Sequence, residues 1–174
     1  MNLVDPNSDE AQRHREELIR TAQELGGSMN RTLWAVNPEN DTLENLVTFL
    51  ADYAPGVLRL QGVSCELELP STLPAIRLKG ETRQHLFLAV NEALNNVLKH
   101  AQATQVHLRV ALTTGELEIT LEDDGVGLSA TGGAKHAGGN GLKNLRTRME
   151  SLGGGCTLSP RAGGGTRLTL RMPA

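Results

Sequence analysis

The sequence predicts an α+β fold, in which a mixed β-sheet carries helices on one face. Three observations lead to this prediction. Five short segments alternate apolar and polar residues, as half-buried strands do. Four longer segments repeat apolar residues every three or four positions, as amphipathic helices do. The strand segments are interleaved with helical ones, which favours a two-layer sandwich around a single core.

The composition is that of an ordinary folded domain and excludes several classes of protein. Of the 174 residues, 39% are hydrophobic and 21% are charged, while only 2% are aromatic, so aliphatic side chains must build the core. A net charge of -3 argues against a general nucleic-acid binder, which usually has a basic face. We expect no membrane contact, because no apolar run is long enough to span a bilayer and Met1 starts no secretory signal.

The first helix is predicted over residues 9–36, with its apolar positions spaced like a heptad repeat. These positions are Leu18, Ala22, Leu25, Met29, Thr32 and Val36. Thr32 is polar, and the Gly26–Gly27 pair is unfavourable within a helix, so the match is imperfect. Two interpretations stay open: a surface helix docked on its own domain, or part of a helical dimerisation bundle.

The second helix is predicted to start after Pro38, which disfavours helical geometry at the residue before it. Asp41 is expected to cap this helix, with Glu44 closing a capping box, and Pro55–Gly56 to end it. Its apolar stripe consists of Leu43, Leu46, Val47, Leu50 and Ala54.

The remaining elements follow the same two periodicities. Strands are predicted over 63–69, 106–112, 117–121, 156–160 and 167–173, and the second and third form a hairpin across TTGE. Helices are predicted over 82–101 and 142–152, with a glycine-rich loop over 123–141 before the last of them.

The stretch NEALNNVLKHA, residues 91–101, has a polar face that a solvated helix does not need. At 100° per residue, Glu92, Asn96 and Lys99 share one stripe, and His100 flanks it. Asparagine is a poor helix former, so two in succession need a reason. A carboxylate and an amide oxygen one turn apart can bind Mg²⁺, and a lysine can meet a phosphate. A chance polar face remains the alternative for this segment taken alone.

Glycine clusters follow this helix. Asp123 directly follows a predicted strand in LEDDGVGL, where a carboxylate can accept a hydrogen bond from an exocyclic amine such as that of adenine. Gly125 and Gly127 let the backbone approach a flat ligand, although an ordinary acidic turn remains the alternative for this cluster taken alone. Gly139 and Gly141 in GGNGLKNL precede a helix whose N-terminal amides favour phosphate. Neither a P-loop nor a complete dinucleotide fingerprint is present.

A fourth cluster, GGGTRLTL, leads through Thr166 into the last strand. The four clusters, in this order, resemble the N, G1, G2 and G3 boxes of the ATP-binding superfamily that contains gyrase, MutL, Hsp-type chaperones and histidine kinases. NEALNNVLKHAQAT and GNGLKNLRTRMESLGG resemble sensor histidine kinases of the nitrate-sensor type, and WAVNPENDTLENL resembles those with propeller sensors. The resemblance covers residues 82–173 most clearly and implies the Bergerat ATP-binding fold, a two-layer α/β sandwich.

The resemblance also implies roles for individual residues. Asn96 and Glu92 would bind Mg²⁺, and Glu92 and Lys99 would be catalytic. Lys99 and His100 would reach the phosphates, and Asp123 would read the adenine amino group. The other ATP contacts would come from small residues of the G boxes: Gly125, Gly127, Gly139, Gly141, Leu142 and Thr166.

The implied organisation is that of a fragment. Residues 1–8 would be a tag or linker, 9–37 the second helix of a dimerisation bundle, and 38–174 the ATP-binding catalytic domain. Such kinases phosphorylate a histidine on an earlier helix, and His14 in RHREEL lacks the Leu-His-acid context of that site. We therefore expect a fragment that binds ATP without phosphorylating itself. The full-length protein would be a membrane-anchored homodimer that keeps this part in the cytoplasm and passes phosphate to a response regulator.

Two alternatives from other classes stay open. A serine kinase of the anti-sigma type shares the ATP-binding fold, although the preceding helices and the WAVNP segment argue against it. A nucleotide-independent dimerisation or scaffold module would keep a degenerate pocket, whereas all four boxes are intact here. We do not expect a gyrase-like or MutL-like ATPase, because no transducer domain follows the last predicted strand.

Overall fold

The computed structural model describes residues 41–127 and 140–174, which belong to one compact unit, Pro38–Ala174. The helices are α2 (Leu43–Arg59), α3 (Gly80–Asn96) and α5 (Asn140–Ser151), and a π-helix, η2 (Val97–Ala101), continues α3. The strands are β1 (Ser64–Glu68), β2 (Gln105–Thr113), β3 (Glu116–Asp123), β4 (Gly155–Pro160) and β5 (Thr166–Pro173). The predicted helix over 9–36, the segment before it and Gly139 lie outside the described residues.

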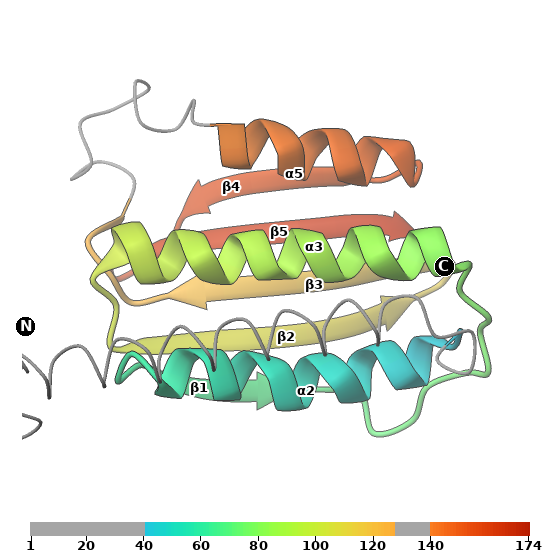
Figure 1. Ribbon diagram of the computed structural model, residues 1–174, viewed down its shortest axis with the longest axis horizontal. Helices are drawn as coiled ribbons and strands as arrows, with labels where there is room; N and C mark the ends of the chain where they lie inside the picture. Colours follow the sequence, from blue (N-terminus) through green and yellow to red (C-terminus); the bar gives the residue numbers. More distant parts are fainter. Residues whose placement is uncertain (1–40, 128–139) are drawn as a thin grey trace, which may run out of the picture. The chain divides into compact units, whose positions relative to one another are not determined.

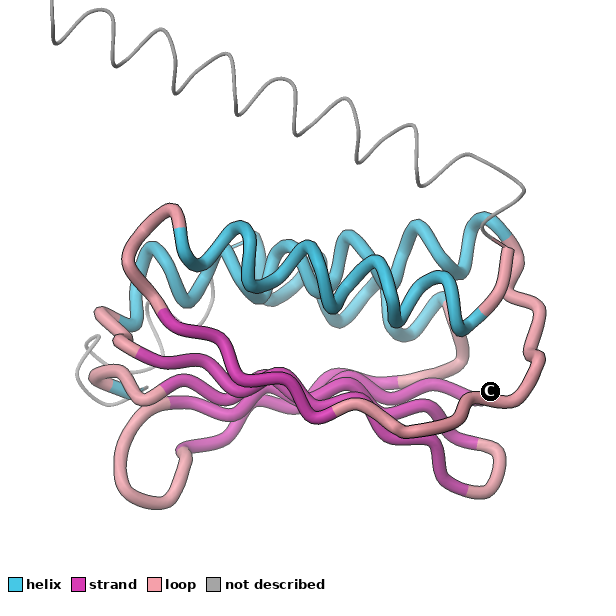
Figure 2. The backbone as a smooth tube through the Cα atoms, turned by 90° about the horizontal axis from the view of Figure 1, so that it is seen from below, coloured by secondary structure: helices cyan, strands magenta, loops and turns pink. Residues whose placement is uncertain are grey.

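The strands form one mixed sheet in the order β1-β2-β3-β5-β4. β1 runs parallel to β2, and the other neighbours are antiparallel. The helices lie on one face of this sheet (Figure 1, Figure 2). The predicted α+β fold, with a mixed sheet and helices on one face, is therefore confirmed, and so is the hairpin of β2 and β3.

Aliphatic side chains fill the space between sheet and helices, as the composition predicts. Leu108, Ile119 and Leu170, from the three central strands, are at most 1% exposed. The chain's two phenylalanines and its single tyrosine add an aromatic cluster between α2 and α3. The ring centroid of Phe87 lies 5.5 Å from that of Phe49 and 5.3 Å from that of Tyr53, at steep edge-to-face angles, a favourable arrangement.

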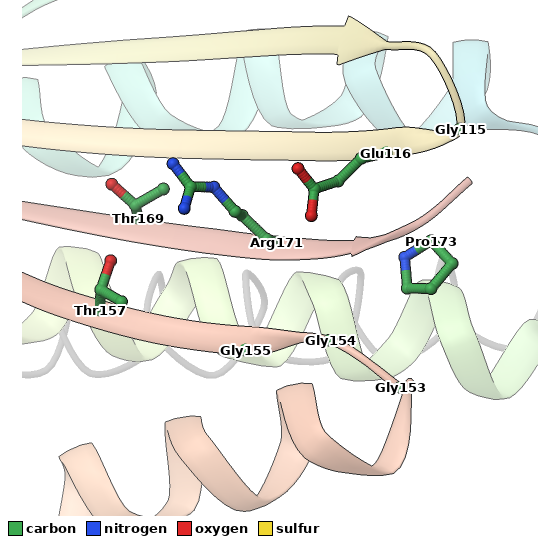
Figure 3. Close-up of a pocket in the computed structure, with 9 residues that line it drawn as sticks. All are labelled: Gly115, Glu116, Gly153, Gly154, Gly155, Thr157, Thr169, Arg171 and Pro173. Atoms are coloured by element: carbon green, nitrogen blue, oxygen red, sulfur yellow. The ribbon is translucent and has the colours of Figure 1, made fainter.

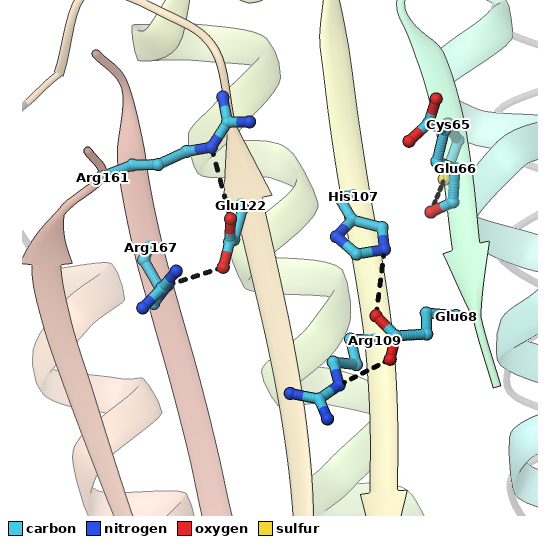
Figure 4. A network of polar contacts seen from close by, with 8 residues as sticks. All are labelled: Cys65, Glu66, Glu68, His107, Arg109, Glu122, Arg161 and Arg167. Carbon is cyan, nitrogen blue, oxygen red and sulfur yellow. Dashed lines mark hydrogen bonds and ion pairs between the residues drawn. The ribbon is translucent and has the colours of Figure 1, made fainter. Parts of the chain in front are cut away.

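The other face of the sheet is polar and carries ion pairs between neighbouring strands (Figure 4). Glu122 lies 2.6 Å from Arg167 and 3.3 Å from Arg161. On the same face, but at the edge formed by β1 and β2, Glu68 pairs with Arg109 at 3.0 Å. Partly exposed pairs of this kind contribute little to stability. They explain the polar half of each alternating strand pattern, because these side chains point away from the helices.

The N-terminal cap of α2 is Thr42, so the predicted capping box of Asp41 and Glu44 is wrong. The hydroxyl oxygen of Thr42 accepts a hydrogen bond from the backbone N–H of Asn45 at 3.1 Å. The Asp41 carboxylate instead pairs with the guanidinium of Arg83 in α3, a side chain that is fully buried. A buried cation needs an anionic partner, and this long-range demand outweighs the local capping preference of Asp41.

The predicted end of α2 at Pro55–Gly56 is also wrong, because the helix continues to Arg59. A proline inside a helix costs about 3 kcal/mol, since it removes one backbone hydrogen bond and crowds the preceding turn. Continuing the helix buries Leu58 completely. Full burial of a leucine contributes about 1.5–3 kcal/mol, which offsets most of that cost.

The predicted helix over 82–101 has its apolar face where the periodicity places it. Leu86, Val90 and Leu94 are at most 1% exposed, and they pack into the core. The prediction of one continuous α-helix is wrong after Asn96, where the chain passes into η2.

Within the described ranges, no helix combines the length and hydrophobicity that crossing a bilayer requires.

Substitution of Thr42 tests whether this residue is the N-terminal cap of α2. Thr42→Ala should lower the free energy of unfolding by about 1 kcal/mol, because the N–H of Asn45 loses its acceptor. Urea unfolding of the whole chain measures this difference. Thr48→Ala is the matched control: Thr48 is exposed within the same helix, and alanine there should leave stability unchanged or slightly higher. Equal effects of the two substitutions would contradict the assigned cap.

Candidate functional site

The candidate site lies at one end of the sheet. There the C-terminal ends of α3 and β3, the N-terminal end of α5 and the start of β5 come together (Figure 1). Glu92 and Asn96 belong to α3, whereas Lys99 and His100 belong to η2. The other predicted residues in the described ranges lie on β3, the loop after it, α5 and β5: Asp123, Gly125, Gly127, Gly141, Leu142 and Thr166. Gly139 lies outside the described residues.

Asp123 occupies the last position of an apolar row. In β3, Leu117, Ile119 and Leu121 face the helices, and Asp123 continues that row two residues further on. Its neighbour across the hairpin is the buried Val106. The side chain is therefore a carboxylate in a core position, and only 4% of Asp123 is exposed.

Two backbone amides donate hydrogen bonds to one oxygen of this carboxylate and so compensate for the water that burial removes. Oδ1 of Asp123 accepts hydrogen bonds from the N–H of Gly125 at 2.9 Å and of Thr166 at 3.2 Å. Burial raises the pKa of the Asp123 carboxyl above its usual range, while these two bonds partly oppose the rise. Both bonds end on Oδ1, so within the described part of the chain Oδ2 stays open to a further donor. An exocyclic amine is such a donor, so the predicted adenine contact fits the orientation of Asp123.

Glycine is needed beside Asp123 because the loops before β5 and after β3 touch through their backbones. A Cβ on Gly165 would overlap the carbonyl oxygen of Asp123, and Gly165 has a φ of +90°. A Cβ on Gly127 would lie 3.2 Å from the carbonyl oxygen of Gly165. The sequence prediction gave ligand approach as the reason for glycine, whereas close packing of the protein with itself is already a sufficient reason. It also missed Gly165 as a site residue, although the run GGGT was the available signal.

Glu92 and Asn96 lie against the first turn of α5. A Cβ on Gly141 would overlap Oε1 of Glu92 and would lie 3.7 Å from Oδ1 of Asn96. Both side chains are half-buried. The N-terminal end of a helix attracts negative charge, so α5 favours the Glu92 carboxylate and equally an anionic ligand there. The structure thus brings these three predicted residues together.

These oxygens fit magnesium better than a metal held by protein alone. Within residues 41–127 and 140–174, no group of three or more His, Cys, Asp or Glu side chains could hold a metal ion. Mg²⁺ typically binds one or two protein oxygens, with water and substrate phosphates completing its shell. One carboxylate and one amide oxygen match that donor set.

The π-helix η2 changes the arrangement of the polar stripe. The wider turn begins at Val97, directly after Asn96, so the spacing assumed for Lys99 no longer holds. Lys99 and His100 are both exposed in this last turn. Asn91, which precedes Glu92 in α3, is directed towards α2 and not towards the candidate site. Its Oδ1 accepts a hydrogen bond from the hydroxyl of Tyr53. π-Helical turns inside helices occur frequently at functional sites.

A pocket in the described structure lies at the opposite end of the sheet and contains none of the predicted residues (Figure 3). Glycines 153–155 line one side of it, and Glu116 and Arg171 line the other. The Nε of Arg171 already donates to Glu118 at 2.7 Å. The predicted site is therefore identified by its converging polar groups and not by this hollow.

Comparison with known proteins finds a family match over residues 81–174, more than half of the chain. The family is described as histidine kinase-, DNA gyrase B-, and HSP90-like ATPase. The matched range contains η2, β3, α5 and β5 in full, and all of α3 except its first residue, Gly80.

Individual relatives agree with this match. The nitrate/nitrite sensor protein NarX of Escherichia coli K12 is 30% identical over 166 residues, which are 90% of this chain and 26% of NarX. The histidine kinase domain of the Erythrobacter litoralis EL346 blue-light activated kinase is 25% identical, with a TM-score of 0.60 over 74% of this chain and 60% of that one. The ATP-binding domain of PrrB from Mycobacterium tuberculosis is 29% identical, with a TM-score of 0.57 over 74% and 93%. The chain spans between 19% and 29% of the length of the first five curated relatives it matches.

Alanine substitutions at two glycines with nearly equal φ distinguish the effect of backbone strain from the effect of steric overlap. Gly163, with a φ of +91°, has open space around its Cβ position, whereas a Cβ on Gly165 would overlap Asp123. Gly165→Ala should therefore lower the free energy of unfolding by about 1–3 kcal/mol more than Gly163→Ala. Chemical denaturation of both variants measures the difference. Equal losses would mean that the contact between the two loops does not constrain the site.

Proposed function

The chain belongs to the family of histidine kinase-, DNA gyrase B- and HSP90-like ATPases, and we propose that it is the ATP-binding catalytic part of a two-component sensor histidine kinase. Residues 81–174 form an ATP-binding domain of that family. The observation that carries the proposal is the Asp123 carboxylate, which is buried at the sheet end with one oxygen held by backbone amides. The similarity to NarX over 90% of the chain supports a sensor kinase within the family.

On the adenine side, Asp123 would select the base. Its Oδ2 would accept a hydrogen bond from the exocyclic amine, and the low exposure of Asp123 would strengthen that bond by excluding water. The amides of Gly125 and Thr166 hold the carboxylate in place, and the absence of a side chain at Gly127 would let the base approach the backbone there. A guanine base presents a carbonyl oxygen at the same position, so the carboxylate would repel it.

On the phosphate side, Asn96 and Glu92 would hold Mg²⁺ through their side-chain oxygens. Bound there, the metal would neutralise phosphate charge and orient the γ-phosphate. Lys99 and His100 are exposed at the end of η2 and would approach the phosphates from that side. The amides of Gly141 and Leu142 in the first turn of α5 would add hydrogen-bond donors, with Gly139 just before them.

The γ-phosphate would pass to a histidine of a dimerisation helix. The described residues offer positioning and charge neutralisation for this step and need no covalent intermediate on the domain itself. In the full-length protein we expect a homodimer anchored in a membrane, with this part in the cytoplasm and a response regulator as the final phosphate acceptor. No histidine in a kinase-like acceptor context lies in this sequence, so the acceptor would lie elsewhere in the full-length protein.

Asp123→Asn tests adenine reading with almost no change of shape. The amide oxygen can keep both backbone bonds now made by Oδ1, whereas the amide nitrogen would replace Oδ2 and oppose the adenine amine. We expect ATP to bind about 10- to 100-fold more weakly. Isothermal titration with Mg²⁺ measures this affinity.

Inosine triphosphate provides the matched ligand, because a carbonyl oxygen replaces the amine of its base. The preference for ATP over inosine triphosphate should shrink or reverse in Asp123→Asn. Equal binding of ATP by parent and variant would show that the base binds elsewhere. Absence of binding by both would favour the scaffold alternative.

Phosphotransfer by the isolated chain is a separate prediction. Incubation with γ-labelled ATP and Mg²⁺ should leave no acid-labile, base-stable label on the chain, because this sequence has no histidine in an acceptor-like context. His14→Gln serves as the control for the only histidine with charged neighbours near the start of the sequence. Stable labelling that His14→Gln abolishes would overturn this prediction and identify the acceptor.

A further inference from the structure

The connection between η2 and β2 is only three residues long, Gln102–Thr104, and the loop after β3 holds it at both ends. At the first end, the N–H of Val126 donates to the carbonyl of Ala101, the last residue of η2, at 2.8 Å. Gly125 packs so closely on the same carbonyl that a Cβ there would overlap it. At the second end, the contacts come from the side chain of Asp124.

Asp124 binds three donors of the connection and of the first residue of β2. Its Oδ1 accepts from the backbone N–H of Thr104 at 2.8 Å and of Gln105 at 2.9 Å, and its Oδ2 accepts from the Thr104 hydroxyl at 2.6 Å. The N–H of Asp124 itself donates to the carbonyl of Gln105 at 3.2 Å. Bonds from Thr104 and Gln105 lower the pKa of Asp124, so the ionised carboxylate is the form that is bound.

The connection needs such support because its backbone is strained. Gln102 has a φ of +51°, and it is the only non-glycine residue with a positive φ in the described part of the chain. A left-handed conformation is unfavourable for glutamine, so the turn persists only if the surroundings hold it. Lys99 and His100 lie just before this turn and are exposed. Their side chains have little packing of their own, so the position of the backbone determines where they reach.

We propose that Asp124 is a positioning residue, which holds the η2–β2 connection so that Lys99 and His100 meet the phosphates of the nucleotide that the neighbouring Asp123 binds through its base. The inference rests on the proposed function, since it requires ATP in this site. Asp123 faces inwards to the base, and Asp124 faces outwards to the connection, because neighbouring residues at the end of β3 point to opposite sides. The two carboxylates therefore link base recognition to phosphate recognition.

Substitution of Asp124 should change the affinity for ATP much more than the affinity for adenosine. Asp124→Ala removes all three side-chain bonds, and we expect ATP with Mg²⁺ to bind about tenfold more weakly while adenosine changes by less than about twofold. Asp124→Asn can keep both N–H bonds to Oδ1, so it should restore most of the ATP affinity. Titration calorimetry gives both constants. Asp52→Ala, at an exposed aspartate of α2, is the matched control and should leave both constants unchanged.

A milder variant covers the case in which Asp124→Ala does not fold. Thr104→Val removes only the hydroxyl bond of 2.6 Å and should weaken ATP binding about threefold, with adenosine binding unchanged. Parallel losses for ATP and adenosine, or no loss for either, would overturn the positioning role, because a general loss of folded protein acts on both ligands alike. A parent chain that binds neither ligand would overturn the proposed function itself, and this inference with it.

Discussion

A carboxylate occupies the last position of the apolar row of β3, and the surrounding site compensates for its burial. Asp123 takes a position that Leu117, Ile119 and Leu121 fill further back along the strand. Its charge is acceptable there because Gly125 and Thr166 direct their amides at one oxygen. Those amides come from the loop after β3 and from the first residue of β5, and these two segments must approach to backbone contact to reach it. The need to satisfy one buried oxygen therefore explains why glycines gather at this end of the sheet.

Most of the fold could be predicted because its signals are local. Periods of two and of 3.6 residues located the strands and helices of residues 41–127 and 140–174, and the apolar face of α3 was correct down to Leu86 and Leu94. The errors have long-range causes. Asp41 does not cap α2 because Arg83, 42 positions away, needs its charge, and Pro55 does not end α2 because Leu58 has a core position to fill. A sequence read locally does not contain those contacts.

The site shows the same division between local and distant causes. Motif spacing placed Glu92, Asn96 and Gly141 in boxes that the fold brings into contact. It did not predict the π-turn after Asn96, whose last residue, Ala101, accepts a hydrogen bond from Val126 in another loop. The role of Asp124 was hidden for a related reason: in the sequence it is one more acidic residue, and only the fold brings Thr104 beside it. Roles for Lys99 and His100 remain predictions based on resemblance and exposure.

The parallel pairing of β1 with β2 has a consequence for how the chain folds. β2, β3, β5 and β4 are antiparallel, and two of their three pairings join strands that follow each other directly in the chain. β1 can join β2 only after the whole of α3 and η2 has crossed over the sheet, since parallel neighbours require such a crossover. Loop closure of that length slows folding. Pairing of β3 with β5 joins residues 45 to 57 positions apart, against 41 for β1 with β2, so both of these closures are long-range. The hairpin of β2 and β3 can therefore take shape first, and the candidate site, which needs β5, α3 and η2 as well, forms only as the whole sheet closes.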